Sequence, residues 1–214
     1  MDSKNTESIS LTTLQRLPNY LRYLKTCEQQ GIVYISSVMI AKGMDLTPMV
    51  VKKDLAVAVI TEGKPKLGYC VESLIYDIEK FLGYDNTKDA VIVGVGKLGH
   101  ALMAYEGFSN YGLNIMIGFD ANVTTSEVNG KKILPMNKFV DLVKRLNIHI
   151  GIITVPKENA QEIADLMVSA GVRAIWNWAP IKLEVPNNIA VKQEDLAASL
   201  AVLSNRLKEL MKKE

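Results

Sequence analysis

The sequence of 214 residues predicts an α/β protein with two domains and a separate C-terminal helix. Three observations lead to this prediction. Residues 18–82 contain short helical patterns and one hairpin pattern, in the order of a winged helix-turn-helix domain. From residue 89 onward, short apolar strands alternate with helical segments, which is typical of a parallel, Rossmann-like sheet. Leucines then recur every three or four residues across 195–213, as on one face of a helix.

Composition restricts the classes of protein that fit this sequence. The longest apolar runs, AVIVGV and IGIITV, have six residues each, whereas a membrane helix needs ~20. No charged and then apolar leader opens the chain, so we expect a soluble, cytoplasmic protein without membrane contact. Cys27 and Cys70 are too few for a disulfide framework or a thiolate zinc site, and we interpret both as reduced thiols. A formal net charge of +2 does not by itself indicate nucleic-acid binding.

The first two helices of the N-terminal domain are predicted from their terminal residues. Pro18 suits the first position of a helix, and apolar residues at helical spacing extend that helix over 18–30. A short β-like run follows. Ser36 or Ser37 can then cap a second helix that ends at Gly43.

A third helix, a hairpin and a fourth helix complete this domain. Thr47 is a suitable N-cap for a short helix whose first residue is Pro48. Alternating valines and alanines, followed by a Glu-Gly-Lys-Pro turn, predict a hairpin over 56–68. The apolar face of residues 71–82 predicts the fourth helix, and Gly83 ends it.

The second domain is predicted from five apolar runs. AVIVG, NIMIGF, KIL, IHIGIITV and VRAIWN predict strands, and the segments between them predict helices. This alternation implies parallel β-α-β units with right-handed crossovers. We therefore divide the chain into a winged-helix domain at 1–85, a Rossmann domain at 86–193 and a C-terminal helix at 194–214.

A glycine-rich turn marks a candidate nucleotide site, because Gly94, Gly96 and Gly99 form a G-x-G-x-x-G sequence between a strand and a helix. The glycines permit a tight turn and close approach of a pyrophosphate, and the helix N-terminus supplies amide donors. Asp120 ends the next strand 21 residues after Gly99, where its carboxylate can bind the adenosine ribose and repel a 2′-phosphate. This pattern predicts NAD(H) rather than NADP(H); the alternative is a structural glycine turn beside an empty crevice. The expected loop contacts are Gly94, Val95, Gly96, Lys97, Leu98 and Gly99.

Two more strand ends are expected to face the same crevice, because ligands of open α/β sheets bind at the carboxyl ends of the strands. The candidate residues follow the fourth and fifth strands: Thr154, Val155, Pro156, Asn177, Trp178 and Pro180. Alternatively, the prolines only end strands and Trp178 belongs to the core.

Residues suited to catalysis are scarce. An enzyme that transfers hydride usually places an acid or a base beside its substrate. His100 lies in the first turn of the helix after the glycine loop and His149 lies inside a strand run, so we interpret both as structural or solvent-exposed. The sequence has no nucleophile motif and no metal-ligand spacing. We therefore expect neither an enzyme nor a metal site.

Basic residues of the N-terminal domain are candidates for DNA contact. In a winged helix-turn-helix, the second helix of the pair enters the major groove and lysines of the wing contact phosphate. The candidates lie on the second and third helices and at the hairpin tip: Ser37, Thr47, Pro48, Lys52, Lys53, Lys64 and Lys66. Charge alone favours a solvated basic surface, whereas the order of the elements favours DNA.

Several motifs together resemble one family. They are RLPNYLRYL, TPMVVKKDL, LGY before a helix, VGVGKLGHAL, YEGF, FD, IGIITVP, NWAP followed by VP, and the leucine-rich last helix. Over nearly the whole chain, this combination is similar to Rex, the bacterial redox-sensing transcriptional repressor. The resemblance implies a homodimer that binds a pseudo-palindromic operator when NAD⁺ dominates and dissociates when NADH binds. It also implies that the last helix is swapped between protomers.

The resemblance further implies a switch between the domains. The family uses an arginine, a tyrosine and an aspartate whose pairing changes with the redox state of the cofactor, and these match Arg16, Tyr105 and Asp195. The chain departs from many members directly after Lys-Asp-Leu, where Ser-Tyr-Phe is replaced by Ala56, Val57 and Ala58. The first wing strand therefore lacks those aromatic residues; we expect the fold to be kept and the details of operator preference to change.

Two other interpretations are compatible with the sequence. One is an NAD-dependent oxidoreductase with an atypical N-terminal domain, which turnover of NADH would favour. The other is a CoA- or nucleotide-binding module without DNA contact, which failure to retard promoter DNA would favour.

Overall fold

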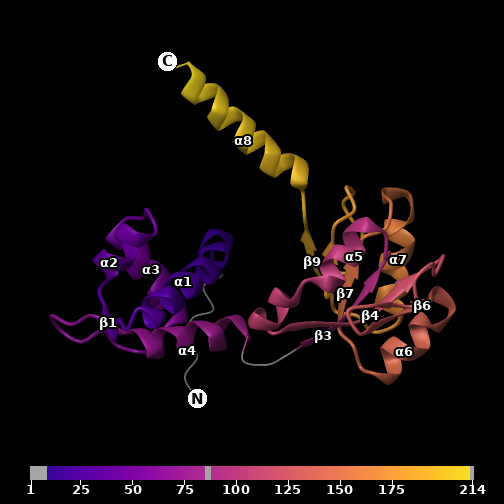
Figure 1. The fold of residues 1–214 in the computed structure, drawn as a ribbon, viewed down its shortest axis with the longest axis horizontal. Helices are drawn as coiled ribbons and strands as arrows, with labels where there is room; N and C mark the ends of the chain where they lie inside the picture. Colours follow the sequence, from indigo (N-terminus) through magenta and orange to yellow (C-terminus); the bar gives the residue numbers. More distant parts are fainter. Residues whose placement is uncertain (1–8, 85–87, 213–214) are drawn as a thin grey trace. The chain divides into compact units, whose positions relative to one another are not determined.

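The computed structural model describes residues 9–84 and 88–212, and the chain forms two compact units at 1–86 and 87–214 (Figure 1). Each unit buries its own cluster of apolar side chains. The boundary expected between residues 85 and 86 falls in the segment 85–87, which lies outside the described residues.

The N-terminal unit is helical, with one small antiparallel pairing of strands. Its elements are α1 (Leu11–Gln29), β1 (Tyr34–Ile35), α2 (Ser37–Gly43), α3 (Pro48–Ala58), β2 (Tyr69–Cys70) and α4 (Val71–Leu82). Strands β1 and β2 pair with each other, and side chains from all four helices form the core. Ser36 and Thr47 cap α2 and α3, and Gly83 in the left-handed conformation ends α4, as predicted.

The first helix begins earlier than predicted. Ser10 caps α1 by accepting a hydrogen bond from the backbone N–H of Thr13, and Pro18 lies inside the helix. A proline there removes one backbone hydrogen bond. The helix nevertheless continues, because its buried face includes Leu17 before the proline and Leu21 and Leu24 after it. The placement of Pro18 at the first helical position was therefore wrong.

The third helix is longer than predicted and replaces the first wing strand. Residues 56–58 are helical, because Leu55 and Ala58 continue the buried face that starts at Val51. The wing is reduced to a bridge between Lys64 and Gly68. Residues 56–58, where the chain departs from the family sequence, therefore lie in the last turn of α3 and not in a wing strand.

The described part of the second unit forms a seven-stranded sheet in the order β5-β6-β4-β3-β7-β8-β9. The strands are β3 (Lys88–Val93), β4 (Leu113–Asp120), β5 (Glu127–Val128), β6 (Lys131–Pro135), β7 (Ile150–Ile153), β8 (Ala174–Asn177) and β9 (Ala190–Gln193). All neighbours are parallel except β5 and β6. The chain runs outward from β3 to β4 and β6, then returns to β7 on the other side of β3. The strand order therefore reverses between β3 and β7, which is where ligands of open parallel sheets bind.

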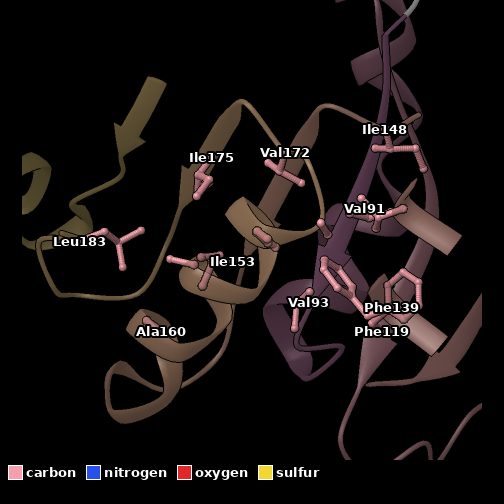
Figure 2. Close-up of a cluster of buried hydrophobic side chains, with 14 of the residues drawn as sticks. Val91, Val93, Phe119, Phe139, Ile148, Ile153, Ala160, Val172, Ile175 and Leu183 are labelled. Atoms are coloured by element: carbon pink, nitrogen blue, oxygen red, sulfur yellow. The ribbon is translucent and has the colours of Figure 1, made fainter. Parts of the chain in front are cut away.

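Helical segments connect the strands, and one more helix, α8 (Leu196–Met211), follows the last strand. Successive residues of β3 face opposite layers of the unit. The connecting segments are α5 (Lys97–Ala104), η1 (Glu106–Tyr111), η2 (Met136–Lys138), α6 (Phe139–Arg145) and α7 (Lys157–Ser169). Val91 and Val93 belong to the cluster with Phe119 and with residues of α6 and α7 (Figure 2). Ala90 and Ile92 belong to the other cluster, which includes Met103 of α5.

Three features of this unit differ from the prediction. Strand β5, which has only two residues, was not predicted. Strand β9 was not predicted, because its residues are exposed or half-buried at the edge of the sheet and form no apolar run. His149 was expected inside a strand but lies directly before β7, where its Nδ1 is 3.2 Å from the carbonyl oxygen of Gly171.

Helix α8 follows β9 and buries none of its residues in the single chain (Figure 1). The side chains of its leucine stripe are 56–68% exposed: Leu196, Leu200, Leu203, Leu207 and Leu210. Among the described residues, no helix is both long and apolar enough to cross a membrane.

Candidate cofactor crevice and nucleic-acid interface

The glycine loop is built tightly at the end of β3. Gly94 has φ of 94°, and a Cβ on it would lie 2.8 Å from the carbonyl carbon of Thr154. A Cβ on Gly99 would overlap the carbonyl oxygen of Gly94, so only glycine lets α5 approach the strand. Gly96 caps α5, and among the described residues no atom other than those of Gly96 and its chain neighbours lies within 4 Å of where its Cβ would be. The helix N-terminus therefore faces open space beside Gly96, as a phosphate-binding loop requires.

Asp120 lies next to this loop at the end of β4. Its Oδ2 accepts a hydrogen bond of 2.6 Å from the backbone N–H of Val95, and its Oδ1 accepts one of 2.9 Å from that of Asn122. Each carboxylate oxygen can accept two hydrogen bonds. One acceptor position per oxygen is therefore left for ribose hydroxyls, and the carboxylate is already oriented.

Thr154 joins β7 to the glycine loop. Its hydroxyl lies 2.6 Å from the carbonyl oxygen of Gly94 and 3.1 Å from that of Val93. The side chain of Val155 lies beside Gly94, and Pro156 precedes α7 as its N-cap residue. The structure thus brings these residues together with the loop, and the Thr154 hydroxyl supports the loop backbone.

The side chain of Asn177 is buried in the protein interior. It is 0% exposed, and its Nδ2 donates to the carbonyl oxygen of Ile181 at 2.9 Å and to Oε1 of Gln193 at 2.7 Å. Its Oδ1 accepts from the backbone N–H of Ala179 at 3.0 Å. The side chain therefore shapes the loop after β8. Gln193 was not predicted as a partner of Asn177, because β9 was not predicted.

The aromatic residues on and after β8 form a connected row with η1. The ring centroids of Trp178 and Trp176 are 5.1 Å apart, and those of Trp176 and Phe108 are 5.6 Å apart. Among the described residues, the indole N–H of Trp178 is buried without an acceptor, whereas that of Trp176 donates to Glu194 at 2.8 Å. Pro180 is exposed and lines a cavity of about 450 Å³ with Gln193 and other residues of this loop and of β9.

The candidate DNA residues of the N-terminal unit differ in exposure. Lys52 and Lys53 are exposed on α3, and Lys66 is exposed in the wing turn with φ of 67°. The Nζ of Lys64 donates a hydrogen bond of 3.2 Å to the hydroxyl of Tyr34. Thr47 accepts a bond from the N–H of Val50 and so caps α3, whose first residue is Pro48. Ser37 is only 7% exposed, so its side chain is not part of the open surface.

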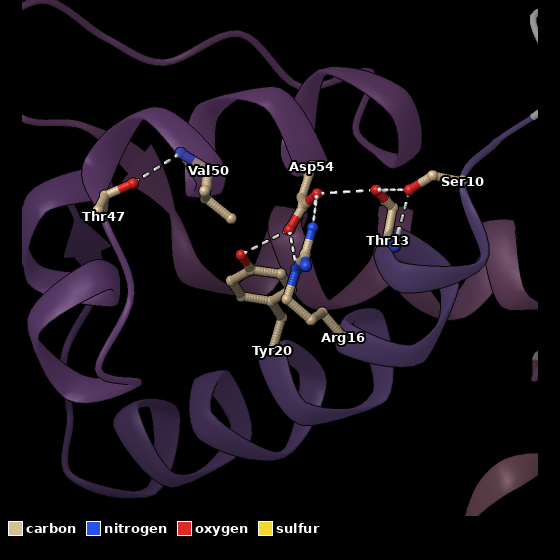
Figure 3. Close-up of polar contacts among 7 residues, drawn as sticks. All are labelled: Ser10, Thr13, Arg16, Tyr20, Thr47, Val50 and Asp54. Atoms are coloured by element: carbon tan, nitrogen blue, oxygen red, sulfur yellow. Dashed lines mark hydrogen bonds and ion pairs between the residues drawn. The ribbon is translucent and has the colours of Figure 1, made fainter.

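Asp54 of α3 is the centre of a polar network that the sequence analysis did not find (Figure 3). The guanidinium of Arg16 donates from Nε to Oδ2 at 2.6 Å and from Nη2 to Oδ1 at 2.8 Å. The Tyr20 hydroxyl donates to Oδ2 and the Thr13 hydroxyl to Oδ1, both at 2.9 Å. The three donors are three and four residues apart, which places them on one face of α1. A correct start for α1 would have suggested this face.

Burial and hydrogen bonding act in opposite directions on this carboxylate. Burial by itself would raise the pKa of Asp54, which is 1% exposed. The hydrogen bonds from Arg16, Tyr20 and Thr13, together with the positive charge of Arg16, hold the pKa below its ordinary value. Burial and the bond to Asp54 raise the pKa of Tyr20. Asp54 is therefore charged and fully paired at neutral pH.

The three candidate switch residues belong to three different elements of the chain. Arg16 is inside α1, whereas the sequence placed it before the first helix. Tyr105 follows the last residue of α5 and is 54% exposed, with its ring 4.9 Å from that of Phe108. Asp195 caps α8 by accepting a hydrogen bond of 3.0 Å from the backbone N–H of Ala198.

Comparisons with known proteins match the part of the chain with the glycine loop and the part with the DNA-binding candidates to two different family models. The family model described as "CoA binding domain" matches residues 85–181, and the one described as "Putative DNA-binding protein N-terminus" matches residues 8–56. The "Redox-sensing transcriptional repressor Rex" of Treponema denticola is 42% identical over 193 residues, which are 89% of this chain and 91% of that protein. The protein of the same name from Bacteroides fragilis is 39% identical over 206 residues, 95% of this chain and 93% of that one.

Two solved structures are similar over nearly the whole chain. The structure of RSP in complex with β-NAD⁺ and operator DNA has a TM-score of 0.88 and 35% identity, and the match covers 96% of each chain. The structure of RSP in complex with β-NADH has a TM-score of 0.85 and 34% identity, and the match covers 98% of this chain and 99% of that one.

Proposed function

This chain belongs to the Rex family of redox-sensing transcriptional repressors, and from this we propose which of its residues bind the cofactor and which bind DNA. It is a repressor and not an enzyme. It binds operator DNA, and NADH releases it. The ratio of NADH to NAD⁺ thereby controls the genes next to its operators.

We assign cofactor binding to the crevice between β3 and β7. The observation that carries this assignment is the glycine loop with Asp120 hydrogen-bonded to its Val95 N–H at 2.6 Å. The amides of residues 97–99, in the first turn of α5, would hold the pyrophosphate, and Asp120 would hold the adenosine ribose. The orphaned indole N–H of Trp178 offers a donor on the side of β8. When bound, NAD supplies a nicotinamide ring whose charge depends on its redox state.

We assign operator binding to α3 and to the wing. The second helix of a helix-turn-helix pair enters the major groove, and Lys52 and Lys53 are exposed there. Lys64 and Lys66 would contact phosphate from the wing. The likeness to RSP, whose structure contains operator DNA, supports this assignment. Because the side chain of Ser37 is buried, we propose that the operator contacts come from the other candidates.

We further propose that the working form is a homodimer that binds a pseudo-palindromic operator in the cytoplasm. Two half-sites about one helical turn apart require two DNA-binding units at a fixed spacing. The exposed leucine stripe of α8 would be covered by the partner protomer. The functional division follows the predicted domains: DNA binding at 1–85, NAD(H) binding at 86–193 and dimerisation at 194–214.

The experiment that tests this function is a titration of NADH into a complex of the protein with its operator, followed by fluorescence anisotropy. We expect NADH to release the DNA at concentrations at which NAD⁺ does not. Because the family model for residues 85–181 is that of a CoA-binding domain, a parallel titration with CoA is the control. Release by CoA and not by NADH would contradict the proposed cofactor.

A further inference from the structure

One face of helix α3 is buried and the other is exposed. Val51, Leu55 and Ala58 are buried against the rest of the N-terminal unit, whereas Lys52 and Lys53 are exposed. The direction in which the exposed face of α3 points therefore depends on how far α3 is rotated about its own axis. Apolar contacts are not directional, so hydrogen bonds from a polar residue on the buried face can define this rotation more precisely.

Asp54 is the one charged residue on the buried face of α3, and its contacts are directional. Each of its carboxylate oxygens accepts one bond from the Arg16 guanidinium and one from a neutral hydroxyl. The planar, two-bond pairing with Arg16 fixes the plane of the carboxylate. The hydroxyls of Thr13 and Tyr20 fill the two remaining acceptor positions. All of the donors come from α1, so the network fixes α3 relative to α1 (Figure 3).

We propose that Asp54 is a positioning residue for operator recognition, which sets the rotation of α3 through its bonds to Arg16, Tyr20 and Thr13. The inference rests on the proposed function, in which α3 enters the major groove. Contacts to base edges need accurate geometry, whereas long lysine side chains can reach phosphates from several positions. Asp54 therefore contributes to the choice of sequence and not to general attraction for DNA.

The test compares two DNA duplexes and two variants of the full chain. One duplex carries the operator, and the other has the same composition in scrambled order. For Asp54→Asn we expect operator affinity to fall about 10- to 100-fold, as for the loss of one or two base contacts. Affinity for the scrambled duplex and its dependence on salt should stay within about twofold of wild type, because phosphate contacts are kept. Affinity for NADH should not change.

Asp77→Asn is the matched control. Asp77 is also a buried aspartate of this unit, 8% exposed, but its carboxylate accepts bonds from the backbone of Ile60 and Thr61 at 3.0 and 2.8 Å. It has no bond to α1. We expect this variant to melt at a lower temperature than wild type while it keeps the wild-type ratio of operator to scrambled affinity.

Arg16→Lys is a second variant of the same network, because the amide of Asp54→Asn faces several donors and can prevent folding. Lysine keeps the charge but cannot form the two-bond pairing. The ratio of operator affinity to scrambled-duplex affinity should therefore fall in Arg16→Lys as well. A wild-type ratio in folded Asp54→Asn, or in Arg16→Lys, would overturn the inference. Equal binding of both duplexes by the wild-type protein would instead contradict the proposed function.

Discussion

The carboxylate of Asp120 is bonded to the backbone N–H of Val95 at 2.6 Å, which joins the end of β4 to the glycine loop at the end of β3. The carboxylate is thus oriented by the protein itself. It needs little reorganisation when a ribose approaches, which favours binding.

Asp120→Ala should weaken NADH binding and relax discrimination against NADPH. Hydrogen bonds to a charged group contribute ~1.5–3 kcal/mol, so we expect roughly a 10- to 100-fold loss of NADH affinity by calorimetry. Asp89→Ala is the control, because Asp89 is exposed near the opposite end of β3 and bonds to Asn114. Unchanged selectivity between NADH and NADPH would remove Asp120 from the site.

Replacement of Lys52 and Lys53 by alanine should make operator binding less dependent on salt. Each lysine that meets a phosphate contributes ~0.9 to the slope of log affinity against log salt. NADH affinity should not change. Lys144→Ala is the control, because Lys144 is exposed on α6 of the other unit. Equal salt slopes for wild type and the double variant would place both lysines off the interface.

Removal of residues 195–214 should give a monomer by light scattering. The cut after Glu194 leaves β9 whole, so the sheet of the second unit is kept. A monomer binds one half-site, whereas a dimer binds two linked half-sites. The operator affinity of the truncated protein should therefore be at least ~100-fold lower. Within the intact chain, Leu203→Lys should also weaken the dimer, whereas Asn205→Lys, on the opposite side of α8, should not. A truncated protein that stays dimeric would refute the role of this helix.

Tyr105→Phe should change the response of the DNA complex to NADH while folding and NADH affinity are kept. Phenylalanine preserves the contact of the ring with Phe108 at 4.9 Å and removes only the hydroxyl. If the hydroxyl contributes to the switch, the NADH concentration at half-release should shift by about 5- to 150-fold, the usual range of allosteric coupling. Tyr76→Phe, at an exposed tyrosine of α4, is the control. A release curve that overlays wild type would exclude Tyr105 from the switch.

Acid should destabilise the N-terminal unit through Asp54. Its pKa is lower in the folded protein than the ordinary ~3.9 of an unfolded aspartate, so the unfolded chain binds more protons. The stability that Asp54 contributes is therefore complete above about pH 4 and is lost as the pH falls through the folded pKa. The urea stabilities of wild type and Asp54→Asn should differ by a constant amount between pH 6 and about pH 5, and should begin to converge as the pH falls below about 4. Parallel curves below this pH would contradict the assigned charge.

The network around Asp54 also restricts how Arg16 can act in a switch. Arg16 already holds two hydrogen bonds to a buried carboxylate and is 26% exposed. Any pairing of Arg16 with Asp195 must compete with this contact. Arg16→Ala leaves the Asp54 charge without its partner, at a cost of roughly 2–4 kcal/mol of stability, because part of the guanidinium is in contact with water.

The sequence predicted the features whose signals are local. The glycine loop, Asp120 and the caps at Ser36 and Thr47 depend on residues close in the chain, and each was found in place. The start of α1 was wrong because the local preference of Pro18 for a first turn was overridden by packing on both sides of it.

Features that depend on distant partners could not be predicted in this way. Asp54 and Arg16 are 38 residues apart, and nothing near either of them indicates the pairing. Strand β9 is recognised only by its pairing with β8, because its own residues are polar or exposed. Asn177 resembled a ligand contact from its position at a strand end, but its side chain is used by Gln193 and the loop that follows.

The crowding around the glycine loop has a genetic consequence. A side chain at Gly94 would collide with the backbone of Thr154, and a side chain at Gly99 would collide with the carbonyl oxygen of Gly94. Each collision is local to the glycine loop, whereas the N-terminal unit has its own core and α8, the proposed dimerisation helix, lies outside the loop. Alleles with a substitution at either glycine should therefore encode super-repressors that silence their target genes whatever the supply of reducing equivalents. In a cell with both alleles, the mutant protein would occupy every operator that the normal protein leaves, so the phenotype should be dominant.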